Sequence, residues 1–125
     1  MELAALELSD IVIFHQYADA AALEQLIAKL QPIGLPMICT EWFARTVGSV
    51  YPTHLPVFAA QDVGCVQWGL VNGRTQTHIP HGWDPANGEP PVWFHDIFRF
   101  DHSPYNMQEI ALVREYAASC KRSQD

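Results

Sequence analysis

The feature that most restricts the fold of this chain is the order of its first three patterned segments. Residues 10–14 and 36–40 are short, mainly apolar runs of the kind that forms buried strands. Between them, residues 20–30 place apolar side chains three and four positions apart, which is typical of a helix with one buried face. Because a strand–helix–strand unit brings its two strands together in parallel, the sequence predicts an α/β fold with a parallel sheet.

The rest of the chain extends this pattern and then departs from it. We predict a short helix at residues 55–60, a third strand at 63–68 and a last helix at 105–119. Residues 72–91 contain four prolines and three glycines and show no helix or strand periodicity. A loop of this length inside a compact domain is usually functional. We therefore expect residues 1–125 to form a single domain with a functional loop after its third strand.

The charge balance of the chain argues against several classes of partner. Seven Lys and Arg residues stand against 14 Asp and Glu residues, for a formal net charge of -7. Nucleic acids and anionic membranes need clustered cations, so we expect neither as a partner. No apolar stretch approaches the roughly 20 residues of a membrane-spanning helix, and the first residues do not resemble a signal peptide. A cytoplasmic location is the simplest expectation.

The three cysteines of the chain are odd in number and show no CxxC spacing. Cys39 and Cys65 fall inside predicted strands, so we expect them to be small core residues rather than disulfide partners or metal ligands. Cys120 lies near the end of the predicted last helix. The cysteines therefore point to no redox or metal chemistry.

Residues able to do chemistry follow the predicted strands where they end. His15 and Tyr17 come after the first strand, Glu41 and Trp42 close the second, and Trp68 closes the third. The carboxyl ends of parallel strands meet at one edge of a sheet, so we expect these side chains to converge. Aromatic faces stack on the apolar faces of sugars, and a carboxylate can attack or stabilise an anomeric carbon. This constellation predicts a carbohydrate site.

These motifs, in this order, resemble the C-terminal part of clan-A glycoside hydrolases, the retaining (β/α)8-barrel enzymes that include family 5. Residues 36–42 look like the seventh strand of that barrel, which ends in the nucleophile. The stretch His15-Gln16-Tyr17 is similar to the His-x-Tyr that follows the sixth strand, and residues 67–70 look like the eighth strand with its Trp. The resemblance implies a partial TIM barrel of about three βα units, equivalent to strands 6, 7 and 8.

The resemblance also implies roles for individual residues. Glu41 would be the nucleophile, Tyr17 would donate a hydrogen bond to it, and His15 would bind a sugar hydroxyl or the acid partner. The residues expected to bind substrate are Trp68, Trp42, Asn72, Arg74, Gln76 and Trp83. Of these, Trp68 would stack on the sugar ring, and the last four lie on the long loop. The resemblance implies no cofactor.

The chain departs from this family in one respect that bears on catalysis. Retaining hydrolysis needs two carboxyl groups about 5–5.5 Å apart. In the family the acid/base is a Glu, usually after Asn, at the end of the fourth strand, and no Asn-Glu pair occurs in this sequence. A whole barrel takes about 250 residues, whereas this chain has 125. We therefore interpret it as a C-terminal half-barrel fragment that needs a missing N-terminal half, or that forms a homo-oligomer through its exposed sheet edges.

Two functions follow from this interpretation, and the sequence leaves both open. The first is retaining hydrolysis of β-glycosidic bonds in polysaccharides or oligosaccharides, once the other half-barrel completes the site. The second is a non-catalytic remnant that acts as an oligomeric carbohydrate-binding or structural domain. Whether this chain is an enzyme is therefore undecided at the level of sequence.

Structural explanations of the same residues stand beside the functional ones. Glu41 can be a buried carboxylate paired with Arg45 or Arg74. His15, Tyr17 and Trp68 can be satisfied core residues, and Trp93 with its aromatic neighbours can serve packing alone. The histidines near the long loop, which are His78, His81 and His95, invite a metal interpretation. No HExxH motif or His–Cys cluster accompanies them, so we expect no metal.

Overall fold

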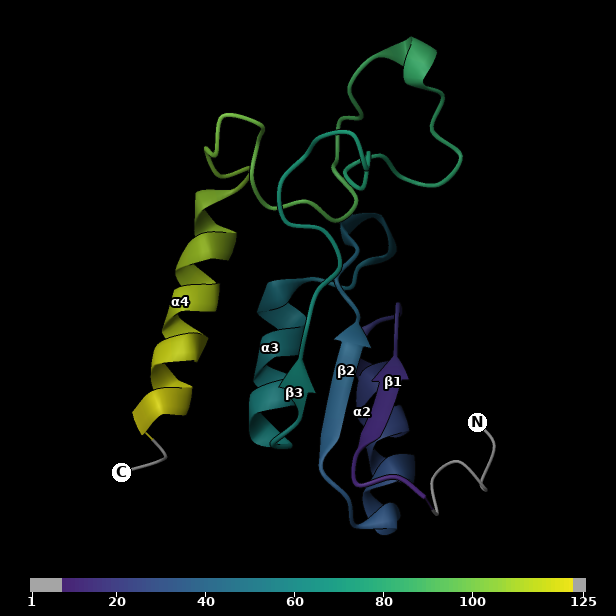
Figure 1. Ribbon diagram of the computed structural model, residues 1–125, viewed down its shortest axis with the longest axis vertical. Helices are drawn as coiled ribbons and strands as arrows, with labels where there is room; N and C mark the ends of the chain where they lie inside the picture. The colour runs from purple at the N-terminus through teal and green to yellow at the C-terminus, as the bar shows by residue number, and fades with distance from the viewer. Residues whose placement is uncertain (1–7, 123–125) are drawn as a thin grey trace.

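The computed structural model describes residues 8–122, which form a three-stranded parallel sheet with helices on one side (Figure 1). The strands lie in the order β1-β2-β3. The strands and α-helices follow one another as β1 (Val12–His15), α2 (Ala20–Leu30), β2 (Met37–Glu41), α3 (Tyr51–Ala60), β3 (Gly64–Cys65) and α4 (Met107–Arg122). Short 3-10 helices occupy Gln31–Ile33, Arg45–Val47 and Pro85–Asn87. The predicted α/β class and parallel pairing are confirmed.

The helix α2 has the bounds that its sequence predicts. Asp19 caps it, because its carboxylate accepts a hydrogen bond from the backbone N–H of Ala22 at 2.8 Å. Leu23, Ile27 and Leu30 form its buried face. Local signals therefore define this helix completely.

The other elements differ from their predicted bounds, by one to three residues at each end in β1, β2 and α4 and with the largest changes of length in α3 and β3. The helix α3 starts at Tyr51 instead of residue 55, because Pro52 lies in its first turn, where no backbone N–H is needed. The strand β3 pairs only over Gly64–Cys65, although residues 63–68 were expected to form it. Val66 still donates a backbone hydrogen bond to Cys39 at 2.8 Å, and the chain then turns through Gly69, whose φ is +86°. Strand length here depends on pairing with β2, which local sequence does not specify.

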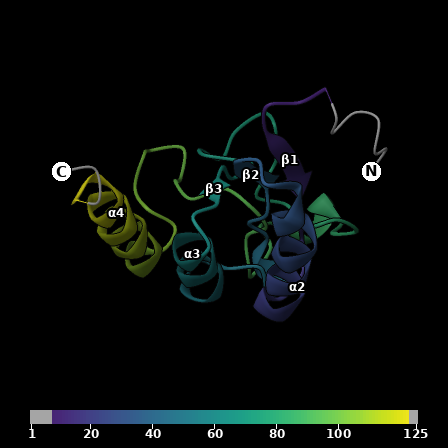
Figure 2. The ribbon, with the colours of Figure 1, turned by 90° about the horizontal axis from the view of Figure 1, so that it is seen from below.

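The apolar core lies between the sheet and the helices α2 and α3, which cover the same face in Figure 2. Along β1, Val12 and Phe14 are buried against the helices while Ile13 and His15 are exposed. Cys39 is fully buried, and burial raises the pKa of its thiol to about 12, so it is an unreactive core residue. Cys65 is exposed, which corrects the expectation that it belongs to the core. The side chain of Cys120 lies outside the described residues.

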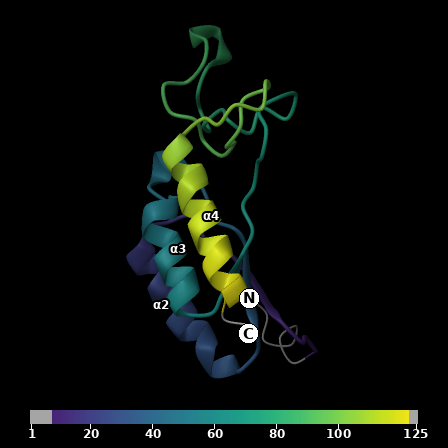
Figure 3. The same cartoon turned by 90° about the vertical axis from the view of Figure 1, so that its left-hand side faces the viewer.

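The opposite face of the sheet is open among the described residues. Figure 3 shows the three helices together on the other side of the molecule. On this face the β1 side chain Ile13 is 56% exposed. Beyond β3, the side chains of Val66, Trp68 and Leu70 are also more than half exposed. Within residues 8–122 the sheet does not close on itself, and β1 and β3 each have one neighbouring strand. The described helices all fall short of the length and apolar character needed to cross a bilayer.

The long segment between β3 and α4 lies beyond the carboxyl ends of the strands (Figure 1). Backbone hydrogen bonds tie it into a defined shape, including Phe94 to His78 at 2.8 Å, His95 to Thr77 at 3.1 Å and Phe98 to Leu70 at 2.9 Å. The predicted loop at residues 72–91 contains no helix longer than the single 3-10 turn at Pro85–Asn87. The loop therefore covers the edge of the sheet where His15, Tyr17 and Glu41 were expected.

Candidate functional site

Glu41 and Tyr17 meet at the carboxyl ends of β1 and β2. The Tyr17 hydroxyl donates a hydrogen bond to Glu41 Oε2 at 3.1 Å, and His15 Nδ1 lies 3.7 Å from the same oxygen. The sheet register pairs His15 with Glu41, and Gln16 N–H donates to the Glu41 carbonyl at 2.9 Å. Parallel pairing thus brings together three residues that are up to 26 positions apart in the sequence.

The protonation of Tyr17 suits its role as a hydrogen-bond donor. Burial, together with the hydrogen bond to Glu41, raises the pKa of the Tyr17 hydroxyl. The hydroxyl therefore keeps its proton at neutral pH and donates a hydrogen bond to the carboxylate. Glu41 Oε1 receives no hydrogen bond from the described residues, and the Glu41 side chain is 29% exposed. One carboxylate oxygen is held in place while the other is open to a ligand.

Glu41 and Tyr17 line an open cavity of about 700 Å³ between the sheet edge and the long loop. Trp68 forms part of its wall with 51% of its surface exposed. The loop side of the cavity includes Gln76 and His81, and apolar groups such as Ile79, Pro80 and Phe94. A cavity of this volume, with aromatic and apolar walls and a few polar groups, is typical of a small-molecule site.

The predicted substrate-binding residues divide into two groups. Trp68 and Gln76 line the cavity. Trp42 does not: it is 1% exposed and packs in the core against Tyr51, His54 and Phe58. The preceding residue, Glu41, lines the cavity, whereas the Trp42 side chain lies in the apolar core. Trp42 is therefore a core residue, which corrects its assignment to the substrate-binding set.

The other predicted residues of the loop do not line this cavity. Asn72 anchors the loop through its backbone, whose N–H donates to the Phe98 carbonyl at 2.9 Å. Arg74 is exposed on the loop surface. Trp83 folds onto its own loop, where its indole N–H donates to the Gly88 carbonyl at 2.9 Å. The loop, which was expected only to be functional, lies over the carboxyl ends of the strands (Figure 1), and the contacts of its individual residues depend on how it folds.

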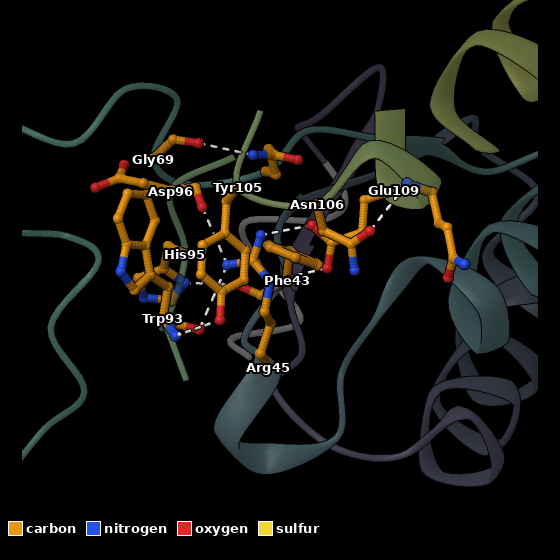
Figure 4. Close-up of polar contacts among 11 residues, drawn as sticks. Phe43, Arg45, Gly69, Trp93, His95, Asp96, Tyr105, Asn106 and Glu109 are labelled. Atoms are coloured by element: carbon orange, nitrogen blue, oxygen red, sulfur yellow. Dashed lines mark hydrogen bonds and ion pairs between the residues drawn. The ribbon is translucent and has the colours of Figure 1, made fainter. Parts of the chain in front are cut away.

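Arg45 has another partner, so it does not pair with Glu41. Its guanidinium donates two hydrogen bonds to Glu109 at 2.8 and 2.6 Å, and a third to the Asp96 carbonyl at 3.0 Å (Figure 4). The same group lies over the rings of Phe43 and Tyr105, at 4.6 and 4.5 Å. We call this contact the Arg45–Glu109 clamp. It joins the 3-10 turn that follows β2, the segment that precedes α4, and the first turn of α4.

His95 is a cavity residue that the sequence did not single out for binding. It is 7% exposed, and its Nδ1 hydrogen-bonds the Phe43 carbonyl, two residues beyond Glu41. Burial lowers the pKa of His95, so the imidazole is neutral at neutral pH. One feature of the sequence could have identified His95: it follows the apolar pair Trp93-Phe94, just as the polar site residues follow the apolar strands.

The histidines near the loop serve separate contacts. His78 Nδ1 lies 3.7 Å from Asp96 Oδ2, and the other oxygen of that fully buried carboxylate accepts from Thr77 Oγ1 at 2.7 Å. His81 packs against the ring of Phe94. Within the described residues, no three His, Cys, Asp or Glu side chains are placed to share a metal ion.

Comparisons of this chain with protein-family models, with curated proteins and with solved structures find no match. The chemistry of the cavity is therefore the basis on which a function can be argued. That chemistry combines a carboxylate held by a phenol, an exposed indole and a neutral imidazole in one space.

Proposed function

We propose that this chain is the part of a retaining glycoside hydrolase barrel that carries the nucleophile, with Glu41 in that role. The observation that carries the proposal is the hydrogen bond from Tyr17 to Glu41 at the ends of adjacent parallel strands. It matches the arrangement implied by the resemblance of residues 15–17 and 36–42 to barrel strands 6 and 7. The cavity and the exposed Trp68 supply space and a stacking surface for a sugar ring.

The first chemical step uses the two oxygens of Glu41 differently. Oε1, which is free of hydrogen bonds from described residues, attacks the anomeric carbon as the bond to the leaving-group oxygen breaks. The leaving oxygen departs with the bonding electron pair and takes a proton from the second carboxyl group that retaining hydrolysis requires. Tyr17 donates to Oε2 and keeps the carboxylate oriented through the step. Water then attacks the anomeric carbon of the glycosyl ester, its proton passes to the second carboxylate, and the bond from that carbon to Glu41 breaks, which returns Glu41 to its carboxylate form.

The second carboxyl group is proposed to come from outside the described residues. Retaining hydrolysis needs it about 5–5.5 Å from the nucleophile, and no other Asp or Glu of the described chain lines the cavity with Glu41. The exposed side chain of Ile13 on the open sheet face, with those of Val66 and Leu70 beyond β3, supplies apolar surface that a completing polypeptide would cover. That polypeptide is either an N-terminal half-barrel or a second copy of the chain.

A second candidate function is a non-catalytic carbohydrate-binding or structural domain that is oligomeric. Two observations favour it, namely the single carboxylate in the cavity and the exposed apolar face of the sheet. In this case Glu41 and Trp68 hold a sugar without bond cleavage.

The test uses substrates whose departure needs no acid. A panel of 2,4-dinitrophenyl 2-deoxy-2-fluoro-β-glycosides, covering glucose, mannose and xylose, is incubated with the full chain and followed by intact mass. The proposal expects a covalent adduct that peptide mapping places on Glu41 and that is absent in Glu41→Gln. The matched control Glu24→Gln changes an exposed carboxylate on α2 and should label normally. Absence of any adduct alongside measurable oligosaccharide binding would support the second function instead.

A further inference from the structure

His95 is attached to the backbone that carries Glu41. Its Nδ1 hydrogen-bonds the carbonyl oxygen of Phe43, and its ring lies 5.7 Å from the ring of Tyr17, measured between centroids. Figure 4 shows the imidazole beside Phe43 and Trp93. The residue therefore has a fixed position relative to both partners in the Tyr17–Glu41 hydrogen bond.

The carbonyl partner decides which nitrogen of His95 holds the proton. A carbonyl oxygen only accepts hydrogen bonds, so Nδ1 must be the N–H donor. Burial lowers the pKa of His95, and the ring consequently carries one proton rather than two. Nε2 is then an unprotonated acceptor with a free lone pair.

This acceptor has no partner among the described residues. Nδ1 is the ring nitrogen with a protein hydrogen bond, and Nε2 is not one of the fully buried polar atoms that lack a partner. His95 lines the same cavity as Glu41 and Tyr17. Nε2 is therefore not sealed in the core, and the side chain that carries it lines the cavity that a ligand would enter.

The chemistry around His95 restricts what this ligand group can be. Glu41 offers carboxylate oxygens, which accept hydrogen bonds, and the Tyr17 hydroxyl already uses its O–H to donate a hydrogen bond to Glu41. An acceptor at His95 beside these groups calls for a ligand group that donates. Sugar hydroxyls satisfy this requirement, because each carries an O–H.

We propose that His95 Nε2 accepts a hydrogen bond from a hydroxyl group of the sugar that binds beside Glu41, an inference that rests on the proposed function. His95 is then a substrate-positioning contact contributed by the segment that joins the long loop to α4. Its bond to the Phe43 carbonyl orients the ring, so the contact and the nucleophile are positioned by the same stretch of backbone.

Two substitutions separate the anchor of His95 from its acceptor. The amide nitrogen of Asn can replace Nδ1, so His95→Asn keeps a donor toward the Phe43 carbonyl and removes the acceptor at Nε2. The longer Gln can place its amide oxygen near the Nε2 position, so His95→Gln restores the acceptor. Binding of cellotriose, mannotriose and xylotriose to the full chain is measured by calorimetry, with thermal unfolding as the control for folding.

We expect His95→Asn to weaken binding of the preferred trisaccharide about tenfold, as the loss of one hydrogen bond does, and His95→Gln to stay within about threefold of wild type. Equal binding by wild type and His95→Asn would overturn the inference, and so would equal losses in both variants. Both of these results leave the proposed function standing. If wild type binds none of the sugars and Glu41 is not labelled by the fluoro glycosides, the proposed function fails, and this inference with it.

A measurement on the unmodified chain covers the case in which a variant does not fold. The side-chain ¹⁵N spectrum of wild type should show His95 Nε2 without a proton, with a signal that moves when the bound trisaccharide is added. A protonated Nε2, or an unprotonated Nε2 whose signal stays in place at saturating sugar, overturns the inference.

Discussion

Arg45→Met is the substitution with the largest expected effect on stability. The Arg45 and Glu109 side chains are only 6% and 10% exposed, and the guanidinium donates two hydrogen bonds to the carboxylate. Removing Arg45 leaves the Glu109 charge buried without its partner and takes a donor from the Asp96 carbonyl. Breaking a buried pair in this way costs about 3–5 kcal/mol. That is a large share of the roughly 5–15 kcal/mol by which domains are stable.

Urea denaturation followed by circular dichroism measures this effect. With an m value of about 2 kcal/mol/M, a loss of about 4 kcal/mol moves the midpoint by about 2 M. The matched control is Arg114→Met, which removes an exposed charge from α4, the helix that carries Glu109, and should change stability by less than about 0.5 kcal/mol.

A double variant tests the reason for the loss. Arg45→Met combined with Glu109→Leu removes both charges, so no buried ion is left without a partner, and the double variant should be more stable than Arg45→Met alone. The reasoning is refuted if Arg45→Met unfolds within about 1 kcal/mol of wild type. It is also refuted if the double variant is no more stable than the single one.

Three further predictions concern the site, the pH dependence and the loop. Tyr17→Phe should slow labelling of Glu41 by the fluoro glycosides about tenfold, because the carboxylate loses one hydrogen bond, and unchanged labelling kinetics would contradict this role. Burial lowers the pKa of His54, so below about pH 6.5 the unfolded state binds a proton that the folded state does not bind. The urea midpoint should therefore decrease as the pH is lowered from about 7.5 to about 5.5. This fall should be smaller in His54→Asn, and an equal fall there would exclude His54 as its source. Gly69→Ala should lower the thermal midpoint more than Gly82→Ala. Both glycines have a positive φ, but a Cβ at Gly69 would lie 2.7 Å from Asp96 Oδ1, whereas a Cβ at Gly82 would meet no atom within 4 Å. Equal midpoints in the two variants would contradict this reasoning.

The parts of the fold that the sequence predicted well are those with local causes. The bounds of α2 follow from the cap at Asp19 and the spacing of its apolar side chains, and both signals lie within the helix itself. The parallel pairing of β1 and β2 follows from the helix between them. The strand β3 was predicted too long, because its extent depends on how far its backbone follows β2.

The candidate site divides in the same way. Strand order alone placed Tyr17 and Glu41 at one sheet edge, because the carboxyl ends of parallel strands share that edge. Trp42 was assigned to the wrong side because adjacent residues at a strand end can turn in opposite directions, and the core lies on one side only.

By itself the sequence determined which elements form and which carboxylate ends the second strand, since hydrophobic spacing and capping act over a few residues. Only the tertiary structure decided that Arg45 pairs with Glu109 across 64 positions. It also decided that His95 reaches the cavity through the Phe43 carbonyl. These contacts join segments far apart in the chain, and such contacts are set by how the loop packs on the sheet rather than by any pattern that neighbouring residues carry.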